Sequence, residues 1–114
     1  MQISVTCRHM DITDAIRSYA HEKVEQDLSE FPRIVSVHVI LDVEKYRHSA
    51  ELVVSASNHI QVEAKDVSDD MYVSIDAAVD KTARQLRRHR DKVQDHKSRE
   101  RLADVDIEIE STEE

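Results

Sequence analysis

The residues with the clearest chemical potential are cations spaced three and four positions apart late in the chain. They are Lys81, Arg84, Arg88 and Lys92. At 3.6 residues per turn, this spacing places the four side chains on one line along a helix. Lysine and arginine in such a line match the phosphates of a nucleic-acid backbone and contribute affinity without reading the base sequence. The spacing therefore indicates an outward-pointing cationic ridge.

The charge of the chain is unevenly distributed. The 114 residues have a formal net charge of −8, but residues 81–101 carry nine basic and three acidic side chains, a net charge of +6. Physiological salt screens charges over about 8 Å, so a local basic ridge attracts a polyanion even on an acidic molecule. A solvated helix face crossed by ion pairs, such as Arg87 with Asp91, is an equally good reading of the composition.

Other chemistries have little support in the sequence. The seven histidines and the single cysteine show no recognised zinc spacing, and His21-Glu22 lacks the second histidine of a metalloprotease helix. Glycine is absent, which argues against phosphate loops, dinucleotide fingerprints and nucleophile elbows. We therefore expect no enzymatic activity, no metal, no cofactor and no small-molecule substrate.

Aromatic residues are scarce. They are Tyr19, Phe31, Tyr46 and Tyr72, and the first two fall on a predicted buried face. This scarcity favours recognition of structured RNA by shape and phosphate contacts over base stacking.

Several features predict a cytoplasmic protein that does not associate with membranes. No apolar run approaches the roughly 20 residues that span a bilayer, and the first residues lack a signal-peptide pattern. Cys7 is the only cysteine, which excludes an internal disulfide and fits a reducing compartment.

The cationic ridge lies on a predicted helix from residue 69 to about residue 97. One apolar face recurs at steps of three and four. Ser68 or Asp69 is predicted to cap this helix. The apolar face contains Met71, Ile75, Ala78, Val79, Thr82, Leu86 and Val93.

An earlier helix is predicted from its N-cap Thr13 to about Glu30, ending before Pro32. Lys23 and Asp27 lie beside its apolar face, either as an i,i+4 ion pair or with the lysine free to reach a phosphate. The periodicity alone leaves both readings open. The apolar face contains Ile16, Tyr19, Ala20, Val24, Leu28 and Phe31.

Alternation of apolar and polar residues predicts four strands, at residues 2–7, 34–44, 48–57 and 60–64. In the second strand, the odd-numbered residues from Val35 to Val43 are predicted to face the core. Residues 45–47 form a turn, and Asn58 is expected at a positive φ in the next one.

These elements predict an α+β fold in the order β-α-β-β-β-α. The crossover helix makes the first two strands parallel, and tight turns make the last three a meander. The result is a two-layer sandwich with a four-stranded mixed sheet and both helices on one face. We expect residues 1–97 to form this domain and residues 98–114 to be an acidic, disordered tail.

Three stretches resemble the ribosome hibernation-promoting factors, also called ribosome-associated inhibitors or sigma-54 modulation proteins. They read DITDAIRSYAHEKV, VILDVEKYRHSAEL and DMYVSIDAAVDKTARQLRRHRDK, and the resemblance covers residues 1–96. The chain resembles the short form, which lacks an additional dimerising domain. Glycines that many relatives carry after the first strand and in the last hairpin are replaced here, so those turn types stay open. Gln26 stands where relatives often have a second lysine.

The resemblance implies a non-enzymatic factor, monomeric off the ribosome. It would occupy the mRNA and tRNA channel of the 30S subunit in the 70S ribosome, on 16S rRNA. It would silence translation in stationary phase or stress and promote or modulate 100S dimers. The alternatives are a protein-binding sigma-54 modulator and a general double-stranded RNA-binding module. The rRNA contacts carried over by position are Lys23, Lys45, His48, Lys81, Arg84, Arg87, Arg88, Arg90 and Lys92.

Overall fold

The chain forms the predicted β-α-β-β-β-α order. The computed structural model describes residues 1–102 except residues 10, 12 and 58, with side chains described as far as Arg90. The strands are β1 (Gln2–Arg8), β2 (Ile34–Glu44), β3 (Arg47–Ala56) and β4 (Ile60–Ser68). The helices are α1 (Asp14–Leu28) and α2 (Met71–Leu102).

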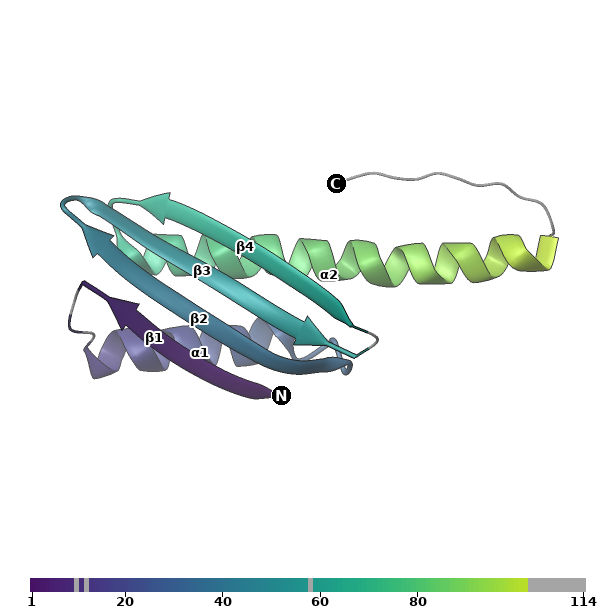
Figure 1. Cartoon of the computed structure of the whole chain (residues 1–114), viewed down its shortest axis with the longest axis horizontal. Helices are drawn as coiled ribbons and strands as arrows, with labels where there is room; N and C mark the ends of the chain where they lie inside the picture. Colours follow the sequence, from purple (N-terminus) through teal and green to yellow (C-terminus); the bar gives the residue numbers. More distant parts are fainter. Residues whose placement is uncertain (10, 12, 58, 103–114) are drawn as a thin grey trace.

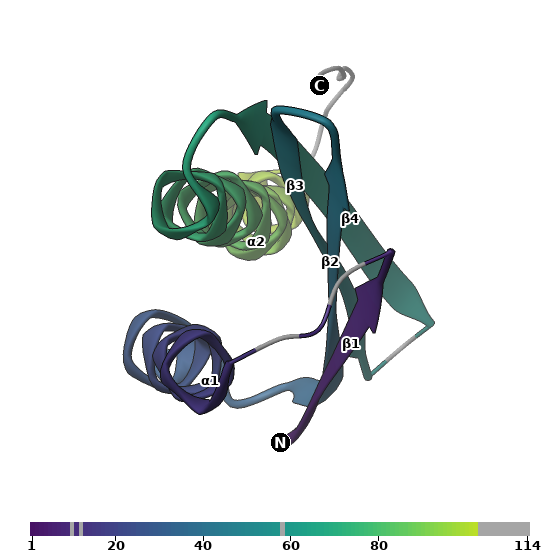
Figure 2. The same ribbon diagram turned by 90° about the vertical axis from the view of Figure 1, so that its left-hand side faces the viewer.

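The four strands form one sheet in the order β1-β2-β3-β4 (Figure 1). β1 pairs with β2 in parallel, and the other neighbouring pairs are antiparallel. Both helices lie against the same face of the sheet (Figure 2). The predicted two-layer α+β sandwich is therefore confirmed, and the outer face of α2 is left free of the sheet.

The core fills the space between the sheet and the helices. Val39, Leu52 and Ala64 lie side by side across β2, β3 and β4, and all three are buried. Ile75 of α2 and Val24 of α1 are fully buried against this layer. Burying a side chain of this size stabilises the fold by about 1.5–3 kcal/mol. This packing fixes the rotation of α2 about its axis.

The start of β2 differs from the predicted alternation. Val35 was predicted to face the core but is 59% exposed, whereas Ile34 is buried. The pairing with β3 shifts register between Ile34 and Ser36. A bulge of this kind inserts one extra residue, so Ile34 and Val37 can both point inward.

Three turns place a non-glycine residue in the left-handed region. The residues are His9 after β1, Lys45 between β2 and β3, and His59 between β3 and β4, with φ between 56° and 61°. The prediction for Asn58 falls outside the described residues. At the β2–β3 turn only Lys45 and Tyr46 lie outside the strands, because Arg47 already pairs with Glu44.

The N-terminus of α2 is capped by Asp70, whose Oδ1 accepts a hydrogen bond from the Tyr72 amide at 2.9 Å. The prediction of Ser68 or Asp69 as the cap is wrong. The Ser68 hydroxyl instead accepts from the Asp70 amide and lies 2.6 Å from the Ser74 hydroxyl. It thereby braces the turn that leads into the helix.

α2 continues to Leu102, beyond the predicted end near residue 97. It projects past the end of the sheet (Figure 1). The last part of the predicted acidic tail, residues 103–114, lies outside the described residues. Within the described part of the chain, neither helix combines the length and hydropathy needed to cross a bilayer.

Candidate nucleic-acid interface

Two arginines occupy the face of α2 that is turned away from the core. Ala83 and Leu86 are buried beneath the helix, whereas Arg84 and Arg88 are exposed one turn apart on the other side. Neither guanidinium has a hydrogen bond or ion pair with any residue whose side chain the structure describes. Both are therefore positioned to bind an anion from outside the chain.

Two further arginines turn towards the C-terminal end of α1. Arg87 Nε lies 3.8 Å, and Arg90 Nη1 3.5 Å, from Glu30 Oε2. The Arg90 guanidinium also stacks 5.4 Å from the centroid of the Phe31 ring. All the charged groups are about half exposed, so each ion pair contributes at most about 1 kcal/mol. A phosphate group can replace Glu30 as the partner of these arginines at small energetic cost.

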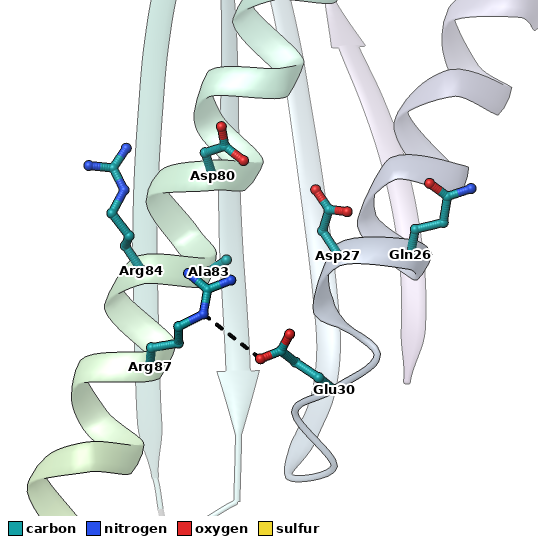
Figure 3. A pocket seen from close by; sticks show the side chains of 7 residues that line it. All are labelled: Gln26, Asp27, Glu30, Asp80, Ala83, Arg84 and Arg87. Atoms are coloured by element: carbon teal, nitrogen blue, oxygen red, sulfur yellow. Dashed lines mark ion pairs between the residues drawn. The ribbon is translucent and has the colours of Figure 1, made fainter.

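An open cleft of about 410 Å³ separates the two helices at this level (Figure 3). Arg84 points away from α1, while Arg87 points across the cleft to Glu30. The α1 side of the cleft has no cation, since Gln26 stands there beside two carboxylates. The α2 side presents Arg84 and Arg87 but also the carboxylate of Asp80, so an anion meets favourable charge only at the arginines. The residues lining the cleft are Gln26, Asp27, Glu30, Asp80, Ala83, Arg84 and Arg87.

Lys81, the first member of the predicted ridge, is held against the edge of the sheet. Its Nζ donates hydrogen bonds to the Lys65 carbonyl oxygen at 3.0 Å and to Asp66 Oδ1 at 3.1 Å. One turn later, Gln85 Nε2 donates to the Glu63 carbonyl oxygen at 3.1 Å. The predicted straight line of free cations is therefore only partly present, because Asp66 already offsets the charge of Lys81. The side chain of Lys92 lies outside the described residues.

Lys23 forms an i,i+4 ion pair, one of the two readings that the periodicity left open, with its Nζ 3.3 Å from Asp27 Oδ2. Asp76 Oδ1 on α2 lies 4.0 Å away and accepts a hydrogen bond from the Tyr19 hydroxyl at 2.6 Å. The hydrogen bond to Asp27 raises the pKa of Lys23, so the amine stays protonated. Two carboxylates offset its charge, which makes Lys23 a weaker attractor of phosphate than Arg84.

The remaining two predicted contacts belong to the hairpin of β2 and β3, whose turn lies at the end of the molecule where α2 begins (Figure 1). Lys45 is exposed in the β2–β3 turn. His48 is half-buried, and its carbonyl oxygen accepts a hydrogen bond from the Ser74 hydroxyl at 2.6 Å. Its Nδ1 is buried without a hydrogen-bond partner among the described residues. The predicted residues thus form two groups rather than one patch.

The acidic partners of these cations were not recognised in the sequence. Glu30, Asp66 and Asp76 come from the turn after α1, from β4 and from the start of α2, and each meets its cation through tertiary packing. No local spacing rule connects residues that are 15 to 60 positions apart. Arg87 was also predicted to pair with Asp91, whose side chain lies outside the described residues.

Histidine and cysteine side chains form no cluster in the described part of the chain. No group of three potential ligands from histidine, cysteine, aspartate and glutamate comes together there. His9 Nδ1 instead lies 2.9 Å from Asp42 Oδ1, and this hydrogen bond raises the pKa of His9.

Comparison with known proteins identifies the family to which the chain belongs. A sequence model of the family described as sigma 54 modulation protein / S30EA ribosomal protein matches residues 3–94. The ribosome hibernation promoting factor of Azotobacter vinelandii is 38% identical over 107 residues, which is 94% of this chain and 99% of that protein. The protein of the same name from Escherichia coli K12 is 36% identical over 96 residues, 84% of this chain and all of that protein.

Solved structures show the same fold. A ribosomal subunit interface protein from Coxiella burnetii superposes with a TM-score of 0.74 and 26% identity, covering 79% of this chain and 98% of that one. The N-terminal domain of Thermus thermophilus protein Y superposes with a TM-score of 0.71 and 29% identity, covering 78% and 99%. The family model, which matches residues 3–94, takes in the four strands, α1 and the part of α2 that carries the arginines.

Proposed function

Since this chain belongs to the sigma 54 modulation protein / S30EA ribosomal protein family, we propose that it binds the small (30S) ribosomal subunit and silences translation. The binding occurs in stationary phase or stress and contacts 16S rRNA along the mRNA and tRNA channel. Relatives named ribosome hibernation promoting factor, and a structural neighbour named ribosomal subunit interface protein, support a ribosomal partner.

The observation that carries this proposal is the pair formed by Arg84 and Arg88. Both guanidiniums lie on the sheet-free face of α2, and neither has a partner among the residues whose side chains are described. Arginine binds phosphate through paired N–H donors, and each contact releases a condensed counterion from the RNA. Arg87 and Arg90 lie on the same stretch of α2, and their ion pairs with Glu30 join groups that are about half exposed.

The mechanism we infer is occlusion rather than catalysis. The α2 cations neutralise rRNA phosphates and hold the domain, and the volume of the sandwich excludes mRNA and tRNA from the space it fills. Recognition through phosphates and RNA shape needs no base-specific code. The place of action is the cytoplasm, and the bound factor promotes or modulates pairing of 70S ribosomes into 100S particles.

The test is sedimentation of the full chain with purified 30S subunits and 70S ribosomes through sucrose gradients. We expect co-migration with both particles, loss of the partner after ribonuclease treatment, and little binding to a free RNA duplex. A change in the 100S peak reports the effect on dimerisation. Binding that survives ribonuclease would favour a protein-binding regulator, and equal binding to free duplex would favour a general double-stranded RNA-binding module. Either result would overturn the proposal.

A further inference from the structure

The turn between β2 and β3 exposes an aromatic side chain. The Tyr46 side chain is 86% exposed, more than any other large hydrophobic residue in the described part of the chain. Tyr19 and Tyr72, by contrast, pack edge to face with ring centroids 4.9 Å apart. Tyr46 therefore contributes nothing to the core, and the fold does not explain its presence.

The turn holds Tyr46 in a defined position. Glu44 and Arg47 are the last paired residues of the hairpin, so only Lys45 and Tyr46 form the loop. Two-residue loops match the twist of antiparallel strands and are tightly constrained. Lys45 adopts φ 56°, a conformation in which glycine or asparagine is favoured. A lysine at such a position points to a use for its side chain.

Cations precede and follow Tyr46 in the sequence. Lys45 and Arg47 are exposed, and neither forms an ion pair with a residue whose side chain is described. With Glu44 included, the four residues 44–47 still have a net charge of +1. An aromatic anchor of a protein–protein interface is normally enclosed by other apolar groups. Tyr46 has charged sequence neighbours instead, the arrangement that binds a nucleobase between two phosphates.

We propose that Tyr46 stacks on an unpaired nucleobase of the ribosomal RNA, with Lys45 and Arg47 contacting the adjacent phosphates. The inference rests on the proposed function and adds a second contact to it. The turn lies at the end of the molecule where α2 begins (Figure 1). Arg84 is 13 residues beyond Met71, about 20 Å further along the helix. The turn therefore meets a different part of the RNA from the arginines.

The test compares affinities for purified 30S subunits. We expect Tyr46→Ala to weaken binding roughly tenfold, the scale of losing one stacked base, and Tyr46→Phe to stay within about twofold. Val35→Ala, which removes another exposed apolar side chain, is the matched control and should bind as the wild type does. Because Tyr46 has no packing role, the alanine variant is expected to fold normally.

Ultraviolet crosslinking identifies what lies against the ring. We expect a nucleotide attached to the peptide that contains residue 46, mapping to an unpaired rRNA position. A crosslink to a ribosomal protein, or equal losses for Tyr46→Ala and Tyr46→Phe, would overturn the stacking inference. Unchanged affinity of Tyr46→Ala with normal wild-type binding would overturn it too, while leaving the proposed function intact. Failure of the wild-type chain to bind 30S subunits would overturn both.

Discussion

The Tyr19 hydroxyl donates a 2.6 Å hydrogen bond to Asp76 Oδ1 and thereby joins α1 to α2. The Tyr72 ring packs edge-on against Tyr19, and Lys23 approaches the same carboxylate. Hydrogen bonds to charged acceptors are stronger than neutral ones, so this contact restrains the two helices relative to one another. The spacing of the helices in turn sets where Glu30 meets Arg87.

The hydrogen bond between Tyr19 and Asp76 makes the stability of the fold depend on pH in the alkaline range. Donation to Asp76, followed by burial, raises the pKa of Tyr19 to about 12 from its ordinary value of 10.0. Between these values the folded state keeps a proton that the unfolded state has lost, so the free energy of unfolding decreases as pH rises from 10 to 12. Below pH 10 Tyr19 is protonated in both states, so it does not make the free energy of unfolding depend on pH.

In an alkaline absorbance titration of the phenolate, the wild type should show one tyrosine ionising near pH 12. Tyr19→Phe should remove this component and lower the free energy of unfolding at neutral pH by about 1–2 kcal/mol. Tyr72→Phe is the control and should keep the late component. A late-titrating tyrosine that persists in Tyr19→Phe would show that the hydrogen bond has been misassigned.

In the proposed complex, Glu30 competes with RNA for Arg87 and Arg90. Glu30→Gln removes the carboxylate beside Arg87 and Arg90, so we expect affinity for 30S subunits to increase about two- to fivefold at low salt. The free energy of unfolding should change by less than about 1 kcal/mol, because the pairs are exposed. Glu25→Gln makes the same charge change on α1 and should bind as the wild type does. Weaker binding of Glu30→Gln would mean that Glu30 positions the arginines instead.

The salt dependence of binding should separate free from engaged cations. Each phosphate contact contributes roughly 0.7 to 0.9 to the log–log slope of affinity against salt. Arg84→Ala should reduce the slope by about that amount, whereas Lys81→Ala should reduce it less, because Asp66 already pairs with Lys81. Affinity measured across a salt series gives both slopes. Equal reductions for the two variants would contradict the distinction between Arg84, which has no described partner, and Lys81, which pairs with Asp66.

Ser74 ties the start of α2 to the sheet. Its buried hydroxyl donates to the His48 carbonyl oxygen at 2.6 Å. Ser74→Ala leaves that oxygen without its partner and should reduce the free energy of unfolding by about 1–3 kcal/mol in urea denaturation. Ser55→Ala, on the helix-free face of β3, should change it by less than about 0.5 kcal/mol. Equal changes in the free energy of unfolding for the two variants would mean that a water molecule replaces the Ser74 hydroxyl as donor to the His48 carbonyl oxygen.

The fold was largely predictable because periodicity is local. Alternation placed Leu52 and Val54 inward, and steps of three and four placed Ile75 and Val79 inward, as found. The bulge at Val35 was not predictable, because Ile34 and Val35 are both apolar and either could face the core. The cap was ambiguous for a similar reason, since three good capping residues follow one another at positions 68–70.

The candidate site was less predictable because several cations of α2 pair with carboxylates from distant parts of the chain. The sequence located the basic segment of α2, but it could not show that Asp66 engages Lys81 or that Glu30 engages Arg90. Those contacts depend on how α1 and β4 pack beside α2. Only the structure shows that Arg84 and Arg88 are exposed without a partner among the residues whose side chains are described.

The central claim is that Arg84 and Arg88 hold the domain on ribosomal RNA. The decisive measurement is co-sedimentation of Arg84→Glu/Arg88→Glu with purified 30S subunits, with circular dichroism to verify folding. The control is Arg8→Glu/Lys65→Glu, which reverses two exposed cations on the helix-free face of the sheet. We predict that the α2 variant folds but no longer sediments with the subunit, while the control still does. Undiminished co-sedimentation of the α2 variant would contradict the account.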